Sequence, residues 1–145
     1  MKFRDDDELV ACAVARDDHS LLHVTTAGFG KRTPIDQYPT KGRGGLGVRG
    51  IKIVEGRGEV VATLAVSDDD EVFLIAADGT IIRVPVDDIS IQGRAATGVR
   101  VMNLDDHGSV AAVARVFAED EDEDDDVPPD PDPPAGDDEP EPAAD

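Results

Sequence analysis

Residues Leu21–Ile53, LLHVTTAGFGKRTPIDQYPTKGRGGLGVRGIKI, are followed by a second version of the same stretch. The second version is Val72–Leu104, VFLIAADGTIIRVPVDDISIQGRAATGVRVMNL, which aligns at an offset of 51 residues without a gap. Nine of the 33 aligned pairs are identical: Gly28/Gly79, Arg32/Arg83, Pro34/Pro85, Asp36/Asp87, Gly42/Gly93, Arg43/Arg94, Gly47/Gly98, Val48/Val99 and Arg49/Arg100. A repeat of this length is typical of propeller-like arrays, in which each repeat is one supersecondary unit.

The second version shows most clearly how one unit is built. Residues 71–77 are apolar and β-prone, Asp78-Gly79 predicts a tight turn, and residues 80–84 return as a second strand. An Asp-Gly pair between two such runs favours a type I′ hairpin. A loop and two further strands are expected at 87–97, 98–104 and 109–116. Because no stretch has helical periodicity with capping, we predict an all-β, propeller-like fold with four antiparallel strands per unit.

The N-terminus continues the same pattern, since Met1-Lys2-Phe3 aligns with Met102-Asn103-Leu104. We therefore expect the end of a truncated unit, a first full unit, a second full unit and a tail, at 1–16, 17–66, 67–117 and 118–145. Units of this kind bury their faces against neighbours, and about three are usually needed for stability. We accordingly expect the sequence to be a fragment of a longer polypeptide, with pairing to other copies of the chain as the alternative.

Charge is distributed very unevenly along the chain. Residues 118–145 contain 15 acidic residues and no Lys or Arg, whereas residues 1–117 contain 18 acidic and 14 basic residues. Little apolar surface and strong self-repulsion predict that the tail is disordered. Asp outnumbers Glu by 24 to 9 and Arg outnumbers Lys by 10 to 4. Such acid-rich, Lys-poor surfaces remain soluble when salt screens charge, so we predict a halophilic protein.

Several function classes find no support in the sequence. Cys12 is the only cysteine, which excludes an internal disulfide and a cysteine zinc site. No signal peptide and no apolar run of about 20 residues is present, so we predict a cytoplasmic protein with no membrane contact. None of the histidines recurs in the other unit with a partner. Tyr38 aligns with Ile89, which favours an apolar anchoring role. We predict no catalytic residue, metal or cofactor on this chain.

Positive charge gathers in the first full unit. Seven Lys and Arg residues lie between positions 31 and 57, against only Asp36 and Glu55. Their centre is Lys41–Gly47, a loop whose glycines bring backbone N–H groups close to a ligand while Arg43 supplies charge, as suits a phosphate backbone. A flexible turn with solvated or acid-paired arginines is the alternative. Recurrence of the arginines in the second unit favours a surface that meets a periodic polyanion.

Other motifs in the chain fail their context tests. Gly42-x-Gly44-x-x-Gly47 has the dinucleotide-binding spacing, but a strand and not a helix is expected after it. The same loop is no P-loop, because Val48-Arg49 follows Gly47 in place of Lys-Ser/Thr. The Asp runs at 5–7 and 68–70 fall at repeat turns, where solvated residues are expected more often than a calcium loop.

The repeated motifs resemble the blades of the DNA gyrase A subunit's C-terminal domain. In the first unit they are LLHVTT-x-G-x-x-KRTPI from Leu21 to Ile35, then Arg43, then GVRGI from Gly47 to Ile51. The resemblance implies a β-pinwheel, a spiral relative of the propeller that binds and bends duplex DNA. It also implies a role in ATP-dependent negative supercoiling. The protein partners in that role are the rest of the gyrase A polypeptide and an ATPase subunit. The C-terminal domain of the topoisomerase IV A subunit, or a propeller-type protein-interaction module, is the alternative.

The family's characteristic box, Gln-Arg-Arg-Gly-Gly-Lys-Gly, is only partly present. Lys41–Gly47 matches it at Arg43, Gly44, Gly45 and Gly47, which suggests a later blade. On the resemblance we expect nine cations to follow the DNA backbone: Lys31, Arg32, Lys41, Arg43, Arg49, Lys52, Arg83, Arg94 and Arg100. Such contacts read charge and deformability with little sequence information. The alternative for Arg32 and Arg83 is a structural role, in which each stabilises its blade by pairing with Asp36 or Asp87. The acidic tail is either a tethered DNA mimic or a solubility segment.

Overall fold

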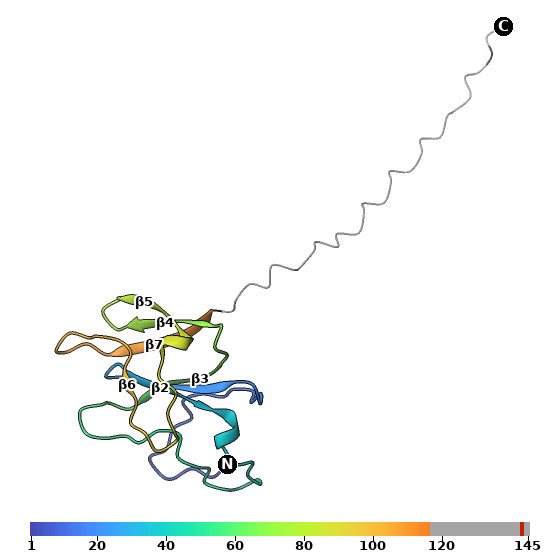
Figure 1. Cartoon of the computed structure of the whole chain (residues 1–145), viewed down its shortest axis with the longest axis vertical. Helices are drawn as coiled ribbons and strands as arrows, with labels where there is room; N and C mark the ends of the chain where they lie inside the picture. The colour runs from blue at the N-terminus through green and yellow to red at the C-terminus, as the bar shows by residue number, and fades with distance from the viewer. Residues whose placement is uncertain (117–142, 144–145) are drawn as a thin grey trace.

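The computed structural model describes residues 1–116 and residue 143 (Figure 1). The predicted tail therefore lies outside the described residues, apart from residue 143. The described part is all-β, as predicted, with two short 3₁₀ helices, η1 (Ile35–Gln37) and η2 (Val86–Asp88). Its strands are β1 (Ser20–Thr25), β2 (Phe29–Pro34), β3 (Val60–Val66), β4 (Glu71–Ala76), β5 (Ile81–Pro85), β6 (Val99–Arg100) and β7 (Val110–Val116).

Two antiparallel sheets form two layers. One has the order β3-β1-β2-β6 and the other the order β5-β4-β7. The layer of β4, β5 and β7 lies apart from the layer that holds β2, β3 and β6 (Figure 1). The repeat is also visible in the backbone, because the register shifts at Val24/Thr25 in β1 and at the aligned Ile75/Ala76 in β4.

The sheets do not coincide with the sequence units. We predicted four antiparallel strands per unit. The first sheet has four strands, but its edge strand β6 comes from the second unit and pairs with β2, so the second sheet has three. Further along the same edge, Arg32 forms a parallel bridge with Ile91. The approach is close: a Cβ on Gly98, which has a φ of 81°, would lie 2.8 Å from the carbonyl oxygen of Gly30. The two units are thus interlocked through β2.

Two segments that align with strands are not strands in the described structure. Val48–Arg49 is the repeat equivalent of β6, and residues 9–15 are the equivalent of β7, yet both are exposed and irregular. In the second unit these segments pair with β2 of the first unit and with β4. Among the described residues, Val48–Arg49 and residues 9–15 have no such strand partner.

The Asp78-Gly79 turn is present, but its type differs from the prediction. A type I′ turn requires positive φ at both central residues, and only Gly79 has it, with a φ of 91°. The Gly79 N–H donates to the Ala76 carbonyl, and the Thr80 N–H donates to Asp78 Oδ1 at 2.8 Å. The Asp78 side chain thus stabilises a longer turn in which glycine alone takes the left-handed conformation.

The hydrophobic core lies between the sheets and is built from both units. Leu22 and Val24 of β1 pack in one cluster with Val72 and Leu74 of β4, and all four are fully buried. Three residues of the second unit complete this cluster, namely Val86 of η2, Ile89 and Met102. The core therefore depends on the contact between units, as the repeat predicted.

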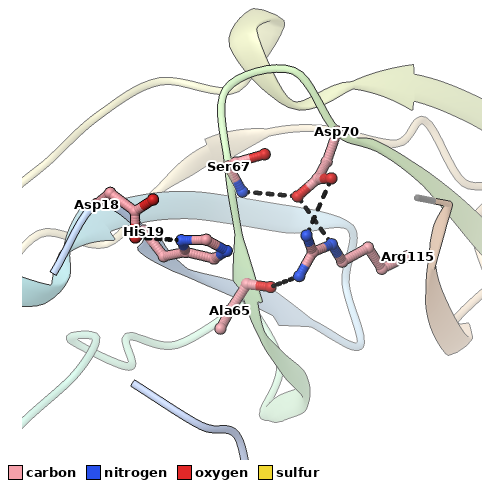
Figure 2. A network of polar contacts seen from close by, with 6 residues as sticks. All are labelled: Asp18, His19, Ala65, Ser67, Asp70 and Arg115. Atoms are coloured by element: carbon pink, nitrogen blue, oxygen red, sulfur yellow. Dashed lines mark hydrogen bonds and ion pairs between the residues drawn. The ribbon is translucent and has the colours of Figure 1, made fainter. Parts of the chain in front are cut away.

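An ion pair with a buried carboxylate joins the two sheets at their edge strands β7 and β3 (Figure 2). Arg115 on β7 lies with Nε 2.8 Å from Asp70 Oδ2, and its Nη1 donates to the Ala65 carbonyl on β3 at 2.9 Å. Asp70 also accepts from the Ser67 N–H at 2.6 Å. The Asp70 side chain is 5% exposed. The pair therefore fixes β7 against β3 through a buried carboxylate, while the Arg115 side chain remains partly exposed.

Candidate nucleic-acid interface

The loop at the centre of the basic cluster is open to solvent. Residues 39–49 are exposed throughout, and Gly44 and Gly47 have positive φ values of 76° and 79°. A Cβ added at Gly42 or Gly44 would meet nothing within 4 Å, so a ligand can approach the backbone here. We call residues 39–53 the first basic loop.

Four of the predicted site residues extend from this loop into solvent: Lys41, Arg43, Arg49 and Lys52. In the part of the chain that the structure describes, none of the four makes a side-chain hydrogen bond or an ion pair. Their charges are therefore not satisfied by described acidic residues. An unpaired cationic loop on a chain of net charge −19 is an electrostatic feature that favours an anionic ligand.

A second basic loop, residues 86–100, lies beside the first. The Lys52 N–H donates to the Ala96 carbonyl at 3.0 Å, which joins the two loops directly. The second loop contributes Arg94, which is half-buried, and Arg100, which is exposed. The structure thus brings six of the nine predicted cations onto these two adjoining loops.

Arg57 is a further cation at this surface, in addition to the nine residues that the sequence indicated. Its guanidinium carbon lies 4.3 Å from the Phe29 ring centroid, and that of Arg100 lies 4.8 Å from the same centroid. Arg57 Nη1 also donates to the Gly98 carbonyl at 2.6 Å. Phe29 therefore orders two arginines that come from different units through cation–π contacts. Arg57 belongs to the basic cluster of the first unit, but the repeat has no Lys or Arg at the aligned position, which is His107 or Gly108.

Lys31 and Arg32, in contrast, are not available to DNA. Lys31 is fully buried and Arg32 is 5% exposed. Arg32 donates from Nε to the Ile89 carbonyl at 2.6 Å and pairs with Asp68. The expectation that these two residues contact the DNA backbone does not fit their burial, and Arg32 instead has the structural role. The acid it meets is Asp68, whereas Asp87 contributes only its backbone carbonyl.

Arg83, the repeat equivalent of Arg32, is exposed on β5. Its guanidinium pairs with Glu71 on the neighbouring strand and lies 5.9 Å from the Phe73 ring centroid. Arg83 therefore lies outside both basic loops and already has an acidic partner.

A buried histidine lies beneath the first basic loop. His23 Nδ1 is 2.9 Å from Thr63 Oγ1, and Nε2 is 2.9 Å from the Tyr38 hydroxyl. Burial, and then the charge of Lys31, lowers the pKa of His23 to about 4. Burial also raises the pKa of Tyr38. His23 is consequently neutral at physiological pH and has a structural role.

This depressed pKa predicts acid sensitivity. An unfolded histidine takes up a proton near pH 6.5, whereas folded His23 does so only near pH 4. The unfolded state therefore binds more protons between these values, and the free energy of unfolding falls as the pH drops through that window. His23→Leu, which introduces the residue found at the aligned Leu74, should lack this part of the pH dependence. Urea unfolding of both proteins at pH 7, 5.5 and 4.5 measures the difference, and identical pH profiles would contradict it.

Other kinds of site are not evident in residues 1–116 and 143. In this part, no three His, Cys, Asp or Glu residues are grouped as a metal site would require. The described residues also include no helix that is long and apolar enough to span a membrane.

Comparison with known proteins agrees with the geometry. The family model described as "DNA gyrase C-terminal domain, beta-propeller" matches residues 1–16, 19–67 and 70–116. The DNA gyrase A subunit of Mycolicibacterium smegmatis is 41% identical over 120 residues, and that of Streptomyces coelicolor is 40% identical over 115. These alignments cover 83% and 79% of this chain, but only 14% and 13% of the relatives. The chain thus spans about one seventh of the relatives it matches.

Solved structures give the same assignment. A structure of a DNA gyrase A C-terminal domain superposes with a TM-score of 0.64 at 32% identity, and covers 68% of this chain and 33% of that one. The C-terminal domain of a DNA topoisomerase IV superposes with a TM-score of 0.67 over 73% of this chain and 33% of that one. Its identity is 22%, so it shows the shared fold alone. With the repeat, the interlocked sheets and the family match in agreement, the chain belongs to the DNA gyrase A C-terminal domain family, whose fold is the β-pinwheel.

Proposed function

We propose that this chain binds duplex DNA with its two basic loops and bends the duplex around them. The observation that carries the proposal is the junction of the loops. Two successive units place their cationic side chains side by side, and none of the exposed cations of the first loop is paired within the described residues. Contacts of this kind are made to phosphates and do not read sequence.

The revised set of proposed contacts follows from burial. It contains the six cations of the basic loops and adds Arg57: Lys41, Arg43, Arg49, Lys52, Arg57, Arg94 and Arg100. Within a whole gyrase A polypeptide, the same contacts would serve DNA wrapping during negative supercoiling in the cytoplasm. ATP would then be bound by the separate ATPase subunit, and this chain itself would hold no cofactor.

Binding of the full chain to fluorescent duplexes tests the proposal. We expect a duplex of about 40 base pairs to bind more tightly than one of about 10 base pairs. The gain should exceed the factor that the larger number of binding positions on the longer duplex gives, because wrapping adds contacts. Poly-glutamate, an acidic polymer without the phosphate spacing, should compete poorly. If it competes as well as DNA, the basic loops are better explained as a surface for an acidic protein partner. If a folded sample binds neither, both interpretations fail.

A further inference from the structure

The buried amine of Lys31 connects three parts of the chain. Its Nζ donates to Thr33 Oγ1 at 2.7 Å, to the Gly50 carbonyl at 2.7 Å and to the Gly93 carbonyl at 2.8 Å. Gly50 belongs to the first basic loop and Gly93 to the second. Thr33 reinforces the contact with the second basic loop, because its hydroxyl donates to the Gln92 carbonyl at 2.7 Å. A single side chain on β2 thus holds both basic loops.

The second unit has no such arrangement. Five buried or half-buried polar residues form a hydrogen-bonded group that meets the first basic loop at Gly50: His23, Lys31, Thr33, Tyr38 and Thr63. We call them the polar network. Their aligned residues in the second unit are all apolar: Leu74, Ile82, Val84, Ile89 and Val113. The same backbone therefore forms with an apolar interior at these positions, so the polar network is not needed to make a unit.

Burial of an amine without a carboxylate partner is costly, and hydrogen bonds offset only part of that cost. The charged or titratable groups that interact with Lys31 are His23 on β1 and Arg94 in the second loop, and Tyr38 after η1 contacts His23. Among the described residues, Lys31 makes no ion pair with an acid. Burial of Lys31 therefore does not favour the stability of its own unit. What Lys31 contributes is its contacts with Gly50 and Gly93 in the two basic loops.

We propose that Lys31 is a positioning residue for DNA binding, which fixes the first basic loop against the second so that their cations meet one segment of duplex together. It does not touch DNA itself. The inference rests on the proposed function and adds the residue that sets the geometry of the interface. Without the contacts to Gly50 and Gly93, each loop would retain its charges but lose its fixed distance from the other.

Protonation adds a distinctive consequence. Burial, and then the charge of Arg94, lowers the pKa of Lys31 to about 8. Phosphates that approach Arg94 stabilise a nearby positive charge, so bound DNA favours the protonated amine. DNA affinity should therefore fall as the pH rises from 7 to 9.5, because the free protein must then take up a proton to bind. Neither His23 nor Tyr38 titrates in this window, since their pKa values are displaced in opposite directions.

The test uses Lys31→Ile in the full chain, which introduces the residue of the aligned Ile82. Arg16→Gln, which also removes one positive charge but lies outside both loops, is the matched control. At pH 7 we expect Lys31→Ile to weaken duplex binding about tenfold. The salt slope should fall by an amount equivalent to about one to two phosphate contacts, because loops that move independently engage fewer phosphates. The pH dependence between 7 and 9.5 should flatten in this variant only.

A measurement without DNA separates this inference from the proposed function. Amide hydrogen exchange at Lys52, whose N–H donates to Ala96, should become about tenfold faster in Lys31→Ile and remain unchanged in Arg16→Gln. Unchanged exchange together with an unchanged salt slope and pH profile would overturn the positioning role, even if the wild type binds DNA. If exchange is faster in Lys31→Ile but the wild-type chain binds no DNA, Lys31 does hold the two loops together. Its role in DNA binding is then refuted. Should Lys31→Ile not fold, Thr33→Val, which matches Val84 and removes one of the three contacts, gives the same readouts at reduced size.

Discussion

Replacing Arg43 and Arg49 together with glutamine is expected to weaken binding to duplex DNA about 30-fold at low salt. Both side chains are exposed on the first basic loop, and neither is paired with a described residue. Each phosphate contact of an exposed arginine contributes about 1 kcal/mol, and about 1.4 kcal/mol corresponds to a factor of ten, so two contacts give roughly this loss. Fluorescence anisotropy with a duplex of about 40 base pairs measures it.

Two further features distinguish this effect from a general loss of charge. The salt slope should decrease by about two in the double variant, because each lost contact releases about one counterion fewer. Arg16→Gln, outside the loops, should leave the slope unchanged. Stability should be unaffected, since residues 39–49 are exposed throughout. If the double variant binds as tightly as the wild type, the first basic loop is not part of a DNA interface.

Replacing Arg115 with methionine is expected to lower the free energy of unfolding by about 3 kcal/mol, because the buried Asp70 carboxylate then keeps an uncompensated charge. Asp70 would retain only the Ser67 N–H, and the Ala65 carbonyl would lose its donor (Figure 2). The effect should reach both units, since Arg115 lies on β7 and Ala65 on β3. Urea unfolding at pH 7 measures the change.

The chain offers its own control for this result. Arg83 and Glu71 form an ion pair whose side chains are 57% and 33% exposed, so Arg83→Met should cost less than about 1 kcal/mol. In Asp70→Asn/Arg115→Met, the loss should be smaller than the sum of the single variants, since no buried charge remains unpaired. A cost for Arg115→Met no larger than that for Arg83→Met would show that the buried pair does not hold β7 against β3.

Much of the fold could be predicted because local sequence determines it. Residues 71–77 and 80–84 are apolar, β-prone and separated by an Asp-Gly pair, and they form β4 and β5. The exchange of β6 between units could not be predicted in the same way. Alternation and composition identify a strand but not its partner, and the aligned Val48–Arg49, with an identical sequence, forms no strand in the described structure. The partner depends on which unit is adjacent in space.

The exposed cations of the candidate site could be predicted from the composition of the first basic loop. Lys41 and Arg43 lie among glycines, and both are exposed. The burial of Lys31 could not be predicted from its neighbours in the sequence, since Arg32 and Thr33 are also polar. Its burial arises from Gly50 and Gly93, which lie 19 and 62 residues away in sequence. The halophilic character and the role of the acidic tail remain predictions.

The central claim, that the two basic loops bind the backbone of duplex DNA, is tested most directly by the salt dependence of that binding in the full chain. The expected result is an affinity that falls linearly with salt on logarithmic axes, with a slope of about −4 to −5, equivalent to roughly five phosphate contacts. A folded sample that binds no duplex at low salt, or whose affinity does not depend on salt, would contradict it.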